Sequence, residues 1–94
     1  MDTDRIDALV ERAERRIEEI AKRYENSDPE TAKAIKELLG FAIQFRVGEC
    51  TKDQERKNHS SKIVFSRMDD MIEKGMREDV LIGYVRQITG IIVM

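Results

Sequence analysis

The sequence predicts an all-α protein, a small antiparallel four-helix bundle that forms a dimer. Three observations support this prediction. Apolar residues recur at helical spacing, the chain has a single proline, and charged residues make up 38% of the chain against 5% for aromatic residues. This combination is typical of helical bundles and coiled coils. A chain of 94 residues is expected to form one domain, which we assign to residues 1–94.

The first helix is predicted over residues 4–25. Six apolar residues along it alternate at spacings of four and three, the period of a helix that packs lengthwise along another helix. They are Ile6, Val10, Ala13, Ile17, Ile20 and Tyr24. On the opposite side, acidic residues precede basic residues by four positions, as Glu11 precedes Arg15, and each such pair contributes roughly 0.2–0.5 kcal/mol. We therefore expect this helix to bury one side against the rest of the chain.

A second helix is predicted over residues 29–47. Asp28 is a preferred N-cap residue, and Pro29 suits the first helical position. Because the link to the first helix is short, the two helices are expected to be antiparallel. Two glycines have specific predicted roles. Gly40 marks a close crossing with another helix, and Gly48 takes the left-handed conformation that ends a helix.

The third helix is predicted over residues 51–74, and its first half is ambiguous. Thr51 and Gln54 match a capping box, which favours a helix that begins at Thr51. Residues 52–62 contain no apolar side chain, so a loop followed by a helix capped at a serine is the alternative. We favour a continuous helix, ended by Gly75, whose later half has an apolar side. That side comprises Val64, Phe65, Met68, Met71 and Ile72.

The fourth helix is predicted over residues 77–92. Its β-branched residues leave a strand as the alternative, but strict alternation of apolar and polar residues is absent. Six apolar residues share one helical face. They are Leu81, Tyr84, Val85, Ile88, Ile91 and Ile92. The helix also carries apolar residues on other sides, more than a small bundle buries, so it is expected to lie between other helices of the chain or between two subunits. We assign these six residues to a dimer interface.

A basic segment over residues 52–67 is the candidate site for nucleic acid or another anion. Its candidate residues are Lys52, Arg56, Lys57, His59, Lys62 and Arg67. Guanidinium and ammonium groups with hydroxyl and amide donors nearby suit phosphate binding. The alternative is a solvated polar face, since Glu49, Asp53 and Glu55 balance the basic residues.

A metal-dependent nucleotide hydrolase is a third hypothesis, based on carboxylates. Asp69, Asp70 and Glu73 cluster in the third helix, and catalysis with hard cations needs carboxylates that converge. Elsewhere, Glu11 and Glu14 resemble the acidic pairs of all-α nucleotide pyrophosphohydrolases in spacing alone, because the helical phase turns them in different directions. With one histidine and one cysteine, the chain does not fit a Cys-based zinc site. We therefore assign no catalytic residue, no metal ligand and no cofactor.

The leading functional hypothesis is a non-catalytic interaction or regulatory protein that acts as a homo-oligomer, a dimer, and docks a protein partner. The alternative is a nucleic-acid or anion-binding module that uses the basic segment. No apolar run approaches the roughly 18 residues that span a bilayer. The charged N-terminus does not match a signal peptide, so we expect a cytoplasmic protein with no membrane partner.

Overall fold

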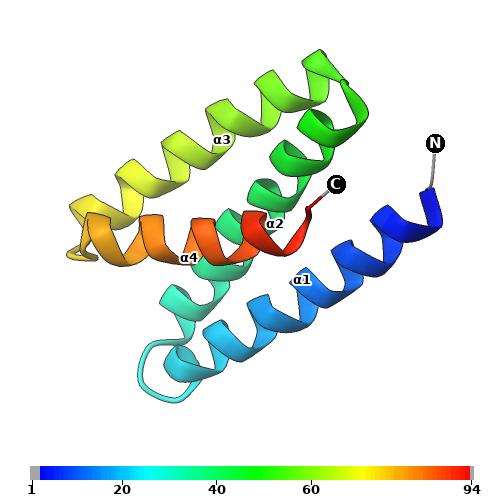
Figure 1. Cartoon of the computed structure of the whole chain (residues 1–94). Helices are drawn as coiled ribbons and strands as arrows, with labels where there is room; N and C mark the ends of the chain where they lie inside the picture. Colours follow the sequence, from blue (N-terminus) through cyan, green and yellow to red (C-terminus); the bar gives the residue numbers. More distant parts are fainter. Residues whose placement is uncertain (1–2, 94) are drawn as a thin grey trace.

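The structure, a computed structural model, describes residues 3–93 and confirms the all-α prediction (Figure 1). Its described residues form four helices: α1 (Thr3–Glu25), α2 (Pro29–Thr51), α3 (Gln54–Glu73) and α4 (Glu78–Ile91). The last element is therefore a helix and not a strand. No helix within residues 3–93 combines the length and apolar character needed to cross a membrane.

The first three helices are antiparallel neighbours joined by short turns, with α2 in the centre (Figure 1). The fourth helix departs from a regular up-and-down arrangement. It crosses over α2 and reaches α1, while α3 and α4 diverge from the turn that joins them. Of the contacting helix pairs, α3 and α4 contact each other least. The diverging helices α3 and α4 thus form a wedge, and residues of α2, α3 and α4 line a groove between them (Figure 1).

The hydrophobic core lies where α4 covers α1 and α2. Its completely covered large apolar side chains are Ile20, Ile35, Leu38, Leu39, Leu81, Ile88 and Ile92. Burial of each such side chain stabilises the fold by roughly 1.5–3 kcal/mol. Because α4 supplies Leu81 and Ile88, and Ile92 follows directly at its C-cap, the apolar face of this helix holds the chain together from within.

The turn between α1 and α2 agrees with the prediction. The Asp28 side chain accepts a hydrogen bond from the Thr31 backbone N–H at 3.1 Å, and Pro29 occupies the first turn of α2. The hydrogen bonds that Thr31 donates, chiefly from its side chain, lower the pKa of Asp28 below the ordinary value. The ionised carboxylate is thus the form that caps α2.

The turn between α2 and α3 differs from the prediction. Helix α2 does not end at Val47 but continues to Thr51, and the left-handed residue is Lys52, with φ of 59°, instead of Gly48. Gly48 lies inside the helix at the point where α3 approaches. A Cβ atom there would lie 2.9 Å from the backbone nitrogen of Lys57. The close crossing predicted at Gly40 was wrong, since a Cβ atom at Gly40 would meet nothing within 4 Å.

Helix α3 begins at Gln54, and its N-cap is Asp53 rather than Thr51. The Asp53 side chain accepts a hydrogen bond from the Arg56 backbone N–H at 3.1 Å. The Thr51 hydroxyl instead donates to the Val47 carbonyl at 2.8 Å, so the predicted capping box does not form. From Gln54 onward the ambiguous segment is helical, as the continuous-helix interpretation predicts.

Candidate functional site

The wedge between α3 and α4 contains an apolar groove of about 340 Å³. Ala42 and Phe45 line it from α2. Val64, Phe65, Met68 and Ile72 line it from α3, and Ile82 and Val85 line it from α4. Each of the three helices thus supplies apolar side chains, and we call this site the α3–α4 groove.

Phe65 is the most exposed large apolar side chain among the described residues, at 65% exposed, followed by Val93 at 56%. Its position follows from helix geometry. Val64 and Met71 lie seven residues apart and are buried against α2. Phe65 follows Val64 by one residue, which is about 100° around the helix axis, so its ring is turned away from α2 toward solvent beside the groove.

Methionine and isoleucine continue this apolar surface along α3. Met68 and Ile72 are half-buried and follow Phe65 at spacings of three and four residues, so they lie on the same side of the helix. The sequence placed all of these residues on one inward side. In the structure that side is divided in two, one part packed on α2 and the other left at the groove. The sequence does contain a signal for this division. The apolar side of α3 is wider than packing against a single helix requires.

Charged side chains line the groove, with two acids at one end and one base at the other. Asp69 and Glu78 line the end near the α3–α4 turn, and Arg86 lies two turns farther along α4. Lys62 lies two turns before Asp69 on nearly the same side of α3. Among residues 3–93, none of these four side chains forms an ion pair with another part of the chain.

The residues predicted for a dimer interface on α4 occupy a different place. Four of them are buried in the chain's own core, namely Leu81, Tyr84, Ile88 and Ile92. Val85 and Ile91 are half-buried, and Val85 lines the α3–α4 groove. The surplus apolar surface of α4 is thus used largely by α1 and α2, because α4 packs against both of them. Val85 alone of the six borders the groove.

The basic segment does not present its side chains as one surface. The Lys57 ammonium lies 5.9 Å from the centroid of the Phe45 ring, and the Arg67 guanidinium pairs with Glu37 at 3.6 Å. Lys52 lies in the turn before α3.

The remaining three residues of the basic segment, Arg56, His59 and Lys62, are exposed on α3. They follow one another at three-residue steps, and each step rotates the direction by about 60° around the axis. Neighbouring members of this set thus lie on adjoining parts of the helix surface, while Arg56 and Lys62 at its two ends point about 120° apart.

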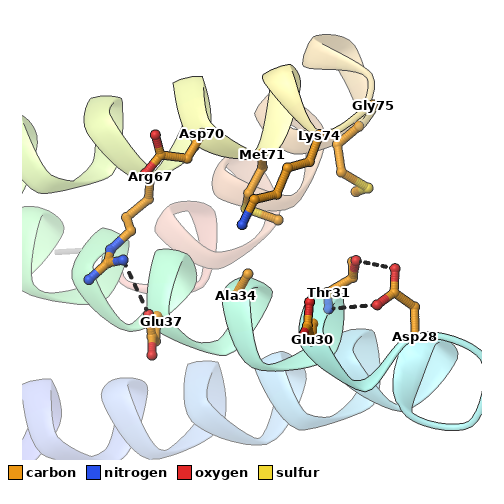
Figure 2. Close-up of a pocket in the computed structure, with 11 residues that line it drawn as sticks. Asp28, Glu30, Thr31, Ala34, Glu37, Arg67, Asp70, Met71, Lys74 and Gly75 are labelled. Atoms are coloured by element: carbon orange, nitrogen blue, oxygen red, sulfur yellow. Dashed lines mark hydrogen bonds and ion pairs between the residues drawn. The ribbon is translucent and has the colours of Figure 1, made fainter.

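A second, polar cavity of about 460 Å³ lies between the start of α2 and the end of α3 (Figure 2). Figure 2 shows the Arg67–Glu37 ion pair at one side and the Asp28–Thr31 cap at the other, with Lys74 extending from α3 toward α2. Side chains of both signs are mixed along this cavity. It therefore has no single charge that would select a ligand.

No metal-binding arrangement is present in the described part of the chain. Within it, no three side chains of histidine, cysteine, aspartate or glutamate are grouped to hold a metal ion. Asp69 and Asp70 point about 100° apart on α3, and Asp69 borders the apolar groove while Asp70 borders the polar cavity. The carboxylates that suggested a hydrolase thus do not converge.

Comparisons with known proteins show no match to a family model, to a curated protein or to a solved structure. The functional argument therefore depends on the geometry of this chain.

Proposed function

We propose that this chain is a non-catalytic interaction or regulatory protein that acts as a homodimer, and that two copies associate through the α3–α4 groove. The observation that carries this proposal is the exposure of Phe65 beside an apolar groove. An exposed aromatic ring next to a concave apolar surface is characteristic of an interaction site.

Association would remove apolar surface from water. Burial of a Phe side chain contributes roughly 1.5–3 kcal/mol, and a symmetric dimer makes that contact twice. Association also costs about 4–15 kcal/mol in translational and rotational freedom. The Phe65 rings alone do not offset this cost, so the half-buried Met68, Ile72 and Ile82 would need to become covered as well. A micromolar dimer is the result we expect from these magnitudes.

The charged side chains at the groove favour a second copy of the chain as its occupant. A surface with acids at one end and bases at the other is complementary to itself when the second copy is reversed. Asp69 and Glu78 line one end of the groove and Arg86 lines the other, with Lys62 two turns before Asp69 on α3. These side chains have no ion-pair partner within the described chain. A partner of a single charge would satisfy only half of them.

Sedimentation velocity over a concentration range of roughly 1 to 200 µM tests the proposal. We expect the wild-type protein to shift from monomer to dimer as its concentration rises. Phe65→Gln should abolish the shift, because the replacement is polar and no described core contact depends on the exposed ring. A wild-type protein that stays monomeric throughout this range contradicts the proposal.

Val93→Gln is the matched control. Val93 is the other large exposed apolar side chain, at 56%, and it lies beyond the end of α4 and outside the groove. We expect this variant to dimerise like the wild type. Circular dichroism should show the same helix content and melting temperature for all three proteins. If both variants lose dimerisation equally, the groove is not the interface.

A further inference from the structure

Three side chains along one exposed stripe of α3 have an order that allows the stripe to pair with a copy of itself. Lys62 and Asp69 lie seven residues apart, which is about two helical turns, and their directions differ by about 20°. Phe65 lies between them on the neighbouring part of the same surface. All three side chains are exposed, and Asp69 and Phe65 both line the α3–α4 groove. The stripe therefore has the order base, aromatic, acid.

We propose that two copies pair about a two-fold axis that passes α3 between Phe65 and Ser66, with the two α3 helices antiparallel. In this register Lys62 of each copy faces Asp69 of the partner subunit, and the two Phe65 rings meet beside the axis. This inference rests on the proposed function, and it adds the geometry of the contact and the residues that specify it.

The symmetry follows from sequence positions alone. Reversal of α3 about the point midway between Phe65 and Ser66 exchanges position 62 with position 69. In a two-fold interface a contact from one residue to a second is repeated from the second to the first. Each dimer thus contains two Lys62–Asp69 pairs, one on either side of the aromatic contact. A parallel pairing would instead place lysine against lysine and aspartate against aspartate, which is unfavourable.

The charges of α4 agree with the same orientation. Glu78 lies at the end of the groove near Asp69, and Arg86 lies toward the other end. Reversal of the second copy therefore brings the acidic end of each groove toward the basic end of the other. Met68 borders the position where the partner's Phe65 would lie, and the flexible methionine side chain adapts its shape to a neighbouring ring.

Charge reversal tests this register. Lys62→Glu creates two acid–acid contacts in its own dimer, and Asp69→Lys creates two base–base contacts. We expect each variant alone to raise the dimer Kd at least about fivefold in sedimentation equilibrium at low salt. An equimolar mixture of the two should form heterodimers, because both contacts then join opposite charges. Native mass spectrometry with one variant labelled with ¹⁵N distinguishes the heterodimer from both homodimers.

Two variants with the same charge change serve as controls. Arg56→Glu and Asp70→Lys lie on α3 outside the stripe, and both residues are exposed. We expect each to dimerise within about twofold of the wild type, and their mixture to show a random distribution of species. An excess of heterodimer in the control mixture would mean that net charge, and not the register, directs pairing, and this would overturn the inference.

The outcomes separate this inference from the proposed function. Suppose Phe65→Gln abolishes the dimer while Lys62→Glu and Asp69→Lys pair as readily as the wild type. The groove is then the interface, and the proposed register is wrong. If the wild-type protein does not dimerise, the proposed function fails and the register fails with it. Preferential heterodimers of Lys62→Glu with Asp69→Lys support both.

Discussion

The hydroxyl groups of Tyr24 and Tyr84 share a hydrogen bond, with their oxygens 2.8 Å apart, and this contact joins the end of α1 to the middle of α4. Tyr84 is 7% exposed, so the pair lies at the edge of the core. Burial, followed by the hydrogen bond to Tyr84, raises the pKa of Tyr24 to about 12. The contact is one of the few specific links that fix how α4 crosses the other helices.

This pair predicts that stability falls at high pH. The folded chain holds the Tyr24 proton more tightly than the unfolded chain, in which the pKa is 10.0. The contribution of Tyr24 is therefore complete below pH 10 and is lost as pH rises toward about 12. We expect the free energy of unfolding of Tyr24→Phe to be about 1 kcal/mol lower than that of the wild type near pH 8. This difference should disappear as the pH approaches about 12. Urea denaturation at a series of pH values measures both proteins. A difference that does not change with pH would contradict the assignment.

Gly48 and Gly40 predict opposite effects of the same substitution. Both lie inside α2, where alanine is favoured over glycine by about 1 kcal/mol. Gly40→Ala should show this gain, because its Cβ atom would meet nothing within 4 Å. Gly48→Ala should lose about 1–3 kcal/mol overall, because its Cβ atom would lie 2.9 Å from backbone in α3, and overpacking outweighs the propensity gain. Thermal and urea denaturation provide the comparison. Equal effects at the two sites would show that α3 does not approach α2 closely at Gly48.

The two glycines also show where sequence-based prediction stops. Helical period and the Asp28–Pro29 pair predict α1 and the start of α2, because both signals are local. Gly48 was interpreted as a helix stop, since a glycine that ends a helix and a glycine that admits a neighbouring helix look alike in sequence. The choice depends on where α3 lies, and that position depends on contacts between distant parts of the chain.

The start of α3 was mispredicted for a related reason. Thr51 and Asp53 are both suitable caps, and the left-handed conformation of Lys52 decides between them by giving α2 four more residues than predicted.

The candidate site was predicted only in part. Phe65 and Val85 were both recognised as apolar face residues, but their exposure depends on the divergence of α3 and α4. No local signal in the sequence specifies that divergence.

The Asp28 cap predicts a loss of stability in acid. Its pKa lies below the ordinary 3.8 because Thr31 donates hydrogen bonds to it, chiefly from the side chain. Asp28 therefore stabilises the fold above that pH, and the contribution is lost as pH falls below it. We expect Asp28→Ala to lower the melting temperature at pH 7 and to match the wild type more closely at pH 2. Asp28→Asn, a neutral residue that also caps helices, should retain most of the wild-type stability at pH 7. If Asp28→Ala melts with the wild type at pH 7, the cap contributes nothing.

The basic segment predicts weak or absent binding of nucleic acid. A protein that neutralises several phosphates loses a factor of about ten or more in affinity between roughly 50 and 200 mM salt. Here Lys57 lies over Phe45, Arg67 pairs with Glu37, and the exposed Arg56 and Lys62 point about 120° apart around α3. We therefore expect fluorescence anisotropy of labelled duplex and single-stranded oligonucleotides to stay unchanged at the lower salt concentration. A salt-sensitive complex that Arg56→Ala weakens would instead make the exposed side of α3 a nucleic-acid interface. Phe65→Gln would then distinguish the two sites, because it should break the dimer without changing the charge that faces the phosphates.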